Sequence, residues 1–380
     1  MPDLFIKNIG KVFPVGEKKR HGQSAGEICA LSGVNLKIES GCFAALVGAS
    51  GCGKTTLLRM IAGLEHQSEG SVFFDGVCMN DVEPVSRSVS AVFQEYALYP
   101  HLNAFDNMAF PMMRKKLDRE IIRKTIYQTA RSLDIEFLLN RKPRQMSWGQ
   151  RQRVALGRAL CANHSILLLD EPFSGADPNM RGELYRLVQR LQKERKFTCI
   201  FATHNLEDVF HLCTDLILMD HGKVLQTGPP EQLFTNPKDK TCASFFANDP
   251  YNFLPGRIVN LPKGPAIQVM DMVLIPAAYS PSALQPSGNS IDVGCRSSQI
   301  QIVWEPGRSG LRAVLKYKEL HPDGNTLYTF EVGQAKIRAL ARETQMHFCG
   351  ARASLLINPE SVVLFHPETG AALCHERQLS

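Results

Sequence analysis

The sequence lacks any apolar run of the length, about 18 residues, that crosses a bilayer as a helix. Its first residues, Met-Pro-Asp-Leu-Phe, lack the basic and then apolar layout of a secretory leader, so we expect none. The 11 cysteines form no C-x-x-C pair, which argues against a zinc site and against a secreted disulfide scaffold. Free thiols in a reducing cytoplasm are the simplest explanation.

The chain also lacks a strong charge of either sign. Its 43 basic residues exceed its 37 acidic ones by a net charge of +6, spread along the chain, so we expect no nucleic-acid partner. Hydrophobic residues make up 44% and charged residues 21%, which is close to a globular average and excludes disorder or a coiled coil. At about 100–200 residues per domain, 380 residues predict two domains.

The first part of the chain alternates short apolar runs with helical patterns. Because the runs show no polar alternation, they predict strands buried on both faces of a parallel sheet, hence an α/β domain. A helix is predicted between the second and third runs, where apolar residues recur at helical spacing over 184–191. The runs are Phe43–Val47, Ile166–Leu169, Thr198–Ala202 and Leu216–Met219.

The sequence pattern changes after about Pro237. From there on, proline and glycine separate short segments in which apolar and polar residues alternate. The segments 299–303 and 326–330 predict strands, and His321–Asn325 predicts a turn before the second of them. We therefore predict an α/β domain over 1–238 and an all-β, barrel-type domain over 239–380.

A glycine-rich loop follows the first apolar run and leads into a helical pattern, in which Leu57, Leu58, Ile61 and Leu64 are predicted to form one apolar stripe. Glycines let the backbone wrap around a phosphate, which exposed N–H groups and the helix N-terminus attract. Lys54 can reach the β- and γ-phosphates, and the Thr55 hydroxyl can ligate Mg²⁺. The loop fits G-x-x-x-x-G-K-[ST] and reads Gly48, Ala49, Ser50, Gly51, Cys52, Gly53, Lys54, Thr55 and Thr56. We call these residues the phosphate loop.

Cys52 lies inside the phosphate loop. Lys54 and a helix N-terminus are its neighbours, and both lower the pKa of a thiol. We therefore expect a reactive Cys52 whose alkylation blocks nucleotide binding and which bound nucleotide protects.

Two carboxylates follow the second apolar run, at the sheet edge where α/β proteins hold ligands. Asp170 is predicted to hold the metal through a water, and Glu171 to polarise the attacking water as general base. His204 ends the third run and would hold the γ-phosphate or orient Glu171. Gln94 follows another short apolar stretch, and its amide could complete the Mg²⁺ shell and sense the γ-phosphate. By spacing alone, this role and the absence of any role are equally supported.

With these motifs around it, the segment 145–160 resembles the signature of the ATPases of ABC transporters. It reads Gln-Met-Ser-Trp-Gly-Gln-Arg-Gln-Arg-Val-Ala-Leu-Gly-Arg-Ala-Leu. The resemblance covers nearly the whole chain, since the motifs occur in the family's order. They are Phe13, the phosphate loop, Gln94, the signature, Asp170-Glu171, Ser174-Gly175-Ala176-Asp177 and His204.

The resemblance implies ATP and Mg²⁺ as ligands and a homodimer with two shared sites. Ser147, Gly149 and Gln150 of one copy would close on the γ-phosphate held by the other, and Asp177 would lie at that interface. ATP would then favour the closed dimer, and hydrolysis would reopen it.

It also implies partners at the membrane. Phe13 would stack on adenine, while Gln94 and the loop 96–101 would face a membrane subunit. A helical subdomain, roughly 88–155, would carry the motion to two transmembrane permease subunits. A solute-binding protein would deliver the solute to those permeases and so be an indirect partner. The chain would lie peripherally at the cytoplasmic face of the inner membrane.

Some positions depart from the family's pattern. Trp148 stands where Leu-Ser-Gly-Gly-Gln has its first glycine, Asn205 replaces the Asp after the switch histidine, and Gly175-Ala176 replaces Asn-Leu or Ala-Leu. An ATPase-impaired regulatory cassette is therefore an alternative. Because Glu171 and His204 are intact, we predict an active ATPase.

The last 140 or so residues resemble the transport-associated OB-type barrel of importer ATPases. The segments 251–256 and 357–365 are similar to those of the sugar and glycerol-phosphate branch, whereas Arg296-Ser297-Ser298 stands where Arg-Pro-Glu is usual. We therefore expect carbohydrate or glycerol-phosphate import, with polyamine, ferric iron or an inorganic anion as alternative cargoes. A soluble ABC protein of repair or translation is a less fitting class because it commonly carries two cassettes or coiled-coil insertions. A GTPase would carry Asn-Lys-x-Asp, which is absent.

Overall fold

The computed structural model describes residues 2–15, 26–93, 98–246, 249–262, 264–270, 272–274, 290–304, 310–321, 324–342 and 347–373. The chain divides into two compact units, Met1–Glu231 and Gln232–Ser380. Residues 232–238, which we assigned to the first domain from the sequence, group with the second unit. The division falls inside the short helix α7 (Pro230–Thr235).

A six-stranded sheet of order β10-β9-β3-β8-β7-β6 forms the centre of the first unit. Its strands pair in parallel except β10, which runs antiparallel to β9. Every residue of β3, β7 and β8 is buried, as their continuous apolar runs predict. The strands are β3 (Phe43–Val47), β6 (Val89–Val92), β7 (Ile166–Asp170), β8 (Thr198–Thr203), β9 (Asp215–Asp220) and β10 (Lys223–Gly228).

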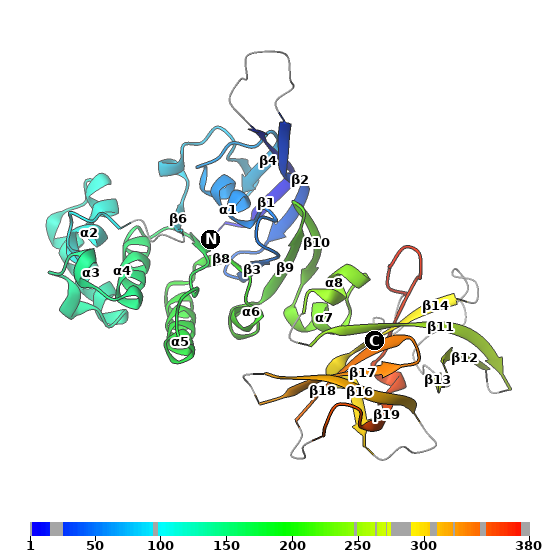
Figure 1. Cartoon of the computed structure of the whole chain (residues 1–380). Coiled ribbons are helices and arrows are strands. Elements are labelled where there is room, and N and C mark those ends of the chain that lie inside the picture. The colour runs from blue at the N-terminus through cyan, green and yellow to red at the C-terminus, as the bar shows by residue number, and fades with distance from the viewer. Residues whose placement is uncertain are drawn as a thin grey trace, which may run out of the picture. The chain divides into compact units, whose positions relative to one another are not determined.

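A second, antiparallel sheet of order β2-β1-β4-β5 belongs to the same unit. Helix α1 (Lys54–Ala62) shares one apolar core with both sheets (Figure 1). Leu57, Leu58 and Ile61 are fully buried there, whereas Leu64, which we placed on the same stripe, is 55% exposed. Gly63 ends the helix in the left-handed conformation, so Leu64 leaves the stripe. The strands are β1 (Leu4–Val15), β2 (Gly26–Ile38), β4 (Glu69–Phe74) and β5 (Val77–Cys78).

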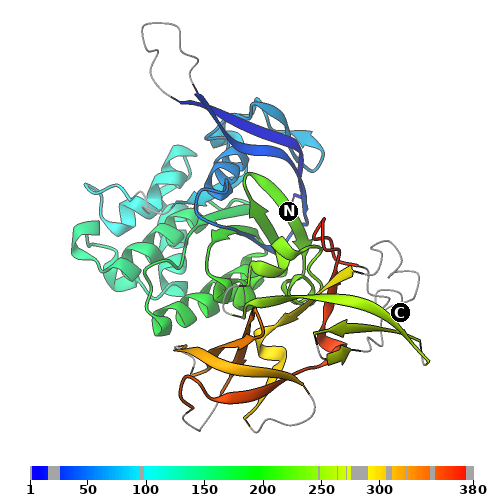
Figure 2. The same cartoon turned by 45° about the vertical axis from the view of Figure 1, so that its right-hand side comes forward.

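The remaining helices of this unit fall into two sets. Helices α2 (Ala104–Arg114), α3 (Arg119–Ser132) and α4 (Trp148–Cys161) pack on one another and lie apart from α1 in both views (Figures 1 and 2). Helix α5 (Pro178–Arg195) follows β7, and α6 (Leu206–Leu212) follows β8. The helix predicted over 184–191 is confirmed, because its apolar stripe is buried in α5.

The second unit is built mostly from two five-stranded antiparallel sheets, of order β13-β12-β11-β14-β20 and β15-β19-β16-β17-β18. Leu254 and Val293 of one sheet share a core with Leu315, Phe330 and Leu355 of the other. An all-β fold of OB-like type is therefore confirmed. Its elements are α8 (Lys240–Ser244), β11 (Tyr251–Leu261), β12 (Gly264–Val269), β13 (Met272–Leu274), β14 (Ser290–Arg296), β15 (Ile300–Val303), β16 (Leu311–Leu320), β17 (Thr326–Val332), β18 (Ala335–Ala341), β19 (Arg352–Ile357) and β20 (Val363–Phe365). Short 3₁₀ turns in the chain are Pro84–Ser86, Glu136–Leu138, Pro143–Gln145, Ser297–Gln299 and Pro359–Ser361.

Arg296 connects the first segment of this unit to its sheet. The guanidinium is 1% exposed, lies 3.5 Å from the ring centre of Phe234, and donates to the carbonyl oxygens of Phe234 and Asp249. Burial lowers the pKa of Arg296 from its usual value, and the rings of Phe246 and Tyr251 lie within cation–π distance. This buried arginine therefore joins Phe234, Phe246, Asp249 and Tyr251 to the end of β14.

We predict that Arg296→Met lowers the free energy of unfolding of the second unit by about 2–4 kcal/mol, because two partly buried carbonyl groups lose their charged donor and the cation–π contacts are lost. Chemical denaturation followed by circular dichroism measures the change. Arg312→Ala, at an exposed position on β16, is the control and should change little. Equal effects of the two substitutions would contradict this role for Arg296.

Candidate functional site

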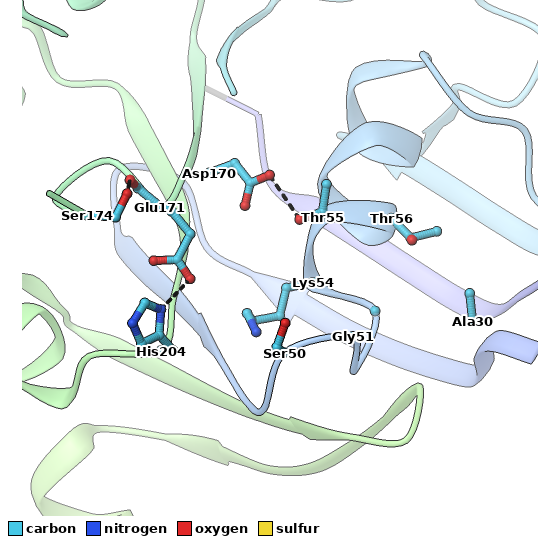
Figure 3. A pocket seen from close by; sticks show the side chains of 11 residues that line it. Ala30, Ser50, Gly51, Lys54, Thr55, Thr56, Asp170, Glu171, Ser174 and His204 are labelled. Carbon is cyan, nitrogen blue, oxygen red and sulfur yellow. Dashed lines mark hydrogen bonds and ion pairs between the residues drawn. The ribbon is translucent and has the colours of Figure 1, made fainter. Parts of the chain in front are cut away.

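A pocket of about 480 Å³ opens where the phosphate loop meets the carboxyl ends of β7 and β8. Because these strands run parallel, their carboxyl ends share one edge of the sheet, where α/β proteins bind ligands. Figure 3 shows the side chains that face this space. We call it the phosphate pocket; its lining residues are Ala30, Ser50, Gly51, Gly53, Lys54, Thr55, Thr56, Asp170, Glu171, Ser174 and His204.

Close approach of backbone explains two glycines of the phosphate loop. A Cβ on Gly48 would lie 2.3 Å from the carbonyl oxygen of Met219. Gly53 has φ +105°, and a Cβ there would lie 2.6 Å from the carbonyl oxygen of Ala30. Helix α1 begins at the next residue, so the free N–H groups of its first turn lie at this loop. The loop therefore has the form of an anion cradle.

Lys54 places its ammonium group inside this cradle. The side chain is buried, and Nζ donates to the carbonyl oxygens of Gly48 at 2.8 Å and Ala49 at 3.0 Å. Its charge is therefore held close to the loop's N–H groups, where it would meet a phosphate oxygen.

Cys52 differs from our expectation. Its Sγ lies 3.8 Å from Lys54 Nζ, and that charge does favour the thiolate. Burial is the larger effect, however, and raises the pKa of the Cys52 thiol above its ordinary value. The prediction of a lowered pKa was wrong, because a sequence shows the neighbouring charge but not the loss of water around the thiol.

A hydroxyl and a carboxylate meet at the position predicted for the metal. Thr55 Oγ1 donates to Asp170 Oδ2 at 2.9 Å, although the two residues are 115 positions apart. Burial raises the pKa of Asp170, and the Thr55 hydrogen bond and the charges of Arg59 and Lys54 oppose this. An all-oxygen pair of this kind fits Mg²⁺, which prefers hard oxygen ligands. Gln94, the further predicted ligand, lies outside the described residues.

Glu171 and His204 form the other pair in the phosphate pocket. His204 Nδ1 lies 2.8 Å from Glu171 Oε1; the Glu171 side chain is 15% exposed and that of His204 68% exposed. Glu171 has φ +51°, an unusual value for a side chain other than glycine, and its N–H donates to Ala202 at 2.9 Å. Ser174 Oγ donates to the Glu171 carbonyl oxygen at 2.8 Å. The carboxylate is therefore fixed from both its main chain and its side chain, as a water-activating base requires.

Phe13 lies outside the group of residues that line the phosphate pocket, on the β1–β2 pair. Phe13 is paired directly with Ile28, so the two side chains share one face of the sheet. Ile28 is 57% exposed, and Ala30, two residues further along β2, lines the pocket. Lys11 Nζ lies 4.8 Å from the centre of the Phe13 ring. No sequence motif marks Ile28 or Ala30; strand pairing places Ile28 beside Phe13, and Ala30 follows two residues later at the pocket.

The signature residues lie in a different pocket, of about 460 Å³. Ser147, Gly149, Gln150 and Asp177 line it together, as predicted for one interface, and we call it the signature pocket. Ser147 Oγ accepts from the Gln150 N–H at 3.3 Å, and Gln150 Oε1 accepts from the Ser147 N–H at 3.0 Å. This capping box starts α4 and was readable from Ser-x-x-Gln in the sequence. Asp177 Oδ1 accepts from the Met180 N–H at 3.0 Å in the first turn of α5.

Asn205, which replaces an acid in the family's pattern, caps the N-terminus of α6. Its Oδ1 accepts from the Glu207 N–H at 2.9 Å. Asparagine and aspartate serve this role about equally well, so the replacement is accounted for locally.

A phosphate cradle between a parallel strand and a helix, with a Thr–Asp pair and a Glu–His pair beside it, defines a P-loop nucleotide-binding domain. Sequence comparison agrees: the model of the ABC transporter family matches residues 31–174. Among the described residues, no helix combines the length and apolar character needed to cross a membrane.

Curated relatives extend the match beyond the cassette. The chain is 34% identical over 340 residues to the sn-glycerol-3-phosphate import ATP-binding protein UgpC of Yersinia enterocolitica, covering 89% of this chain and 92% of that one. It is 42% identical over 235 residues to the maltose/maltodextrin import ATP-binding protein MalK of Escherichia coli, covering 62% and 63%. A solved dimeric ATP-binding cassette, MJ0796 with ADP and Pi, matches with a TM-score of 0.54 at 30% identity, covering 60% of this chain and 98% of that one. The chain belongs to the family of ATP-binding subunits of ABC transporters, and its activity is ATP hydrolysis coupled to transport.

We predict that iodoacetamide labels Cys52 slowly at neutral pH, because its raised pKa leaves little thiolate, and that labelling accelerates as the pH rises toward that pKa. The exposed Cys29, Cys78 and Cys349 should react first and serve as internal references. Mass spectrometry of a time course measures the order, and added MgATP should slow Cys52 alone. Labelling of Cys52 at pH 7 ahead of these three thiols would contradict the effect of burial.

Proposed function

We propose that two copies of this chain close around two ATP molecules and that each site uses the phosphate pocket of one copy and the signature pocket of the other. The observation that carries this proposal is the separation of the two residue sets within one chain. Lys54 and Glu171 line one pocket, whereas Ser147 and Asp177 line the other. A second copy supplies what each pocket lacks, and a two-fold axis makes the two sites equivalent.

The reaction follows from the groups around the phosphate pocket. The phosphate loop and Lys54 bind the β- and γ-phosphates, and Thr55 with Asp170 holds Mg²⁺. When bound, Mg²⁺ supplies positive charge to the β- and γ-oxygens. Glu171 accepts a proton from the attacking water, and His204, at 2.8 Å, holds the carboxylate in position. We assign Gln94 to the metal shell from its motif.

The ATP cycle moves the subunits because the γ-phosphate contacts the signature turn of the second copy only in the closed dimer. A ligand shifts a conformational equilibrium by its differential contacts with the two states, so ATP favours closure and hydrolysis removes that preference. We propose that α2, α3 and α4, within a helical subdomain of roughly 88–155, pass this motion to two permease subunits. The chain would then lie peripherally on the cytoplasmic face of the inner membrane.

We propose that the transported solute is glycerol phosphate or a carbohydrate. The supporting observation is that a UgpC relative matches 89% of this chain, so the likeness includes the second unit and not only the cassette. Polyamine, ferric iron or an inorganic anion remain the competing cargoes, and uptake of labelled glycerol 3-phosphate and maltose by cells with the chain and its neighbouring permeases would separate them. A solute-binding protein would deliver the solute.

We predict that Glu171→Gln lowers ATP turnover about 100-fold or more while ATP still binds, because the base is lost but the cradle is intact. The variant should form a stable dimer in MgATP, which size-exclusion chromatography with light scattering detects. Lys54→Ala, which lacks the ammonium group in the cradle, is the matched control and should stay monomeric. A Glu171→Gln variant that remains monomeric in saturating MgATP, with permeases present, would contradict the shared site. Wild-type ATP turnover no higher than that of this variant would instead favour an ATPase-impaired regulatory cassette.

We predict that Phe13→Ala raises the KM for ATP about tenfold with little change in kcat, because base–aromatic stacking contributes to binding rather than to chemistry. Ile28→Ser should shift KM in the same direction, since Ile28 shares the face of Phe13. Val77→Ala, an exposed apolar position on β5 of the same sheet, is the control. An effect on kcat without one on KM would rule out a binding surface for adenine on this face.

A further inference from the structure

Two positions that depart from the family's pattern contact each other. Trp148 is the first residue of α4, and Gly175 lies in the turn that follows Glu171. A Cβ on Gly175 would lie 3.3 Å from both Cε2 and Nε1 of the Trp148 indole. The ring therefore covers the α-carbon of Gly175, and any side chain there would press against it.

A second contact of the same kind lies beside the first. A Cβ on Gly149 would lie 2.7 Å from Met180 Sδ, so α4 and α5 approach closely at this glycine. The two segments therefore contact each other twice, each time through a glycine and a large side chain. Trp148 of α4 packs on Gly175, and Met180 of α5 packs on Gly149. The first turn of α4 and the segment 174–180 therefore pack as one body.

The segment 174–180 is linked by a hydrogen bond to Glu171, the proposed general base. Ser174 Oγ donates to the Glu171 carbonyl oxygen at 2.8 Å, and the Ala176 N–H donates to Phe173 at 3.3 Å. Glu171 itself has φ +51°, a main-chain conformation that depends on its surroundings. A shift of the turn at Gly175 therefore reaches the main chain of Glu171 through Ser174.

The indole leaves the signature pocket open. Among the described residues, Ser147, Gly149 and Gln150 line that pocket, whereas Trp148 is not one of its lining residues. A large ring in the signature is thus compatible with an open helix N-terminus, provided that position 175 carries no side chain.

We propose that Trp148 is a positioning residue, seated on Gly175, which couples the signature turn to Glu171. The proposal rests on the function proposed above and deepens it. Glycine at position 175 leaves room for the indole at position 148. The two differences from the family's pattern therefore compensate each other, and the site remains competent for hydrolysis.

We predict strong coupling between the two positions in ATP turnover. Gly175→Asn alone should displace the indole and lower kcat about tenfold, because contacting residues are typically coupled. Trp148→Gly alone should lower kcat about threefold, because it removes the indole that packs on Gly175. The double variant should recover to within about threefold of wild type. KM for ATP should change little throughout, since neither residue lines the phosphate pocket. Effects that simply multiply, or a Trp148→Gly variant faster than wild type, would overturn the positioning role.

A fluorescence experiment tests the contact without any turnover. The chain has two tryptophans, so Trp304→Phe leaves Trp148 as the single reporter. In that background, Gly175→Asn should shift the emission to the red and increase acrylamide quenching. Gly76→Asn is the matched control, since Gly76 also has φ +80° but a Cβ there would meet nothing within 4 Å.

The two experiments separate the possible failures. An unchanged spectrum in folded Gly175→Asn, with a thermal unfolding curve like that of Gly76→Asn, would overturn the contact. A wild-type chain without ATP turnover would overturn the proposed function and the positioning role with it, even where fluorescence reports the contact.

Discussion

The hydrogen bond from Thr55 to Asp170, at 2.9 Å, joins the start of α1 to the end of β7. It forms only because β3 and β7 run parallel on either side of β8 and end at the same edge of the sheet. All three strands are buried on both faces, as is typical of parallel strands whose connecting helices cover the sheet. The positions of Thr55 and Asp170, and of Glu171 one residue further, depend on this arrangement of strands.

Within the first unit, two kinds of close packing prepare the site for ATP. In the phosphate loop, main chain approaches main chain at Gly48 and Gly53, which leaves N–H groups free for an anion. At the start of α4, side chains fill the space that Gly149 and Gly175 leave. In the function that we propose, the first arrangement binds the nucleotide directly, and the second joins the signature turn to Glu171.

The sequence was a good guide where motifs carry their own geometry. The phosphate loop, the strand before Asp170 and the helix over 184–191 were predicted because strand and helix periods are local properties. Local reasoning failed at Leu64, where a left-handed Gly63 ended the helix, and at Cys52, where burial outweighed the charge of Lys54. The error at Leu64 concerns a helix end set by the adjoining glycine, whereas the error at Cys52 concerns the packing around the residue, which its neighbours in the chain do not show.

The amino-acid sequence by itself determined the class of this protein, its α/β cassette and the all-β fold that follows it, and it marked the candidate nucleotide-binding residues. Only the tertiary structure decided which of those residues meet. It brought Glu171 to His204, placed Ile28 beside Phe13 through strand register, and seated Trp148 on Gly175. The physical reason is that residue types and their spacing set local conformation, whereas contacts between distant segments depend on how close-packed elements fill space, which no local pattern records.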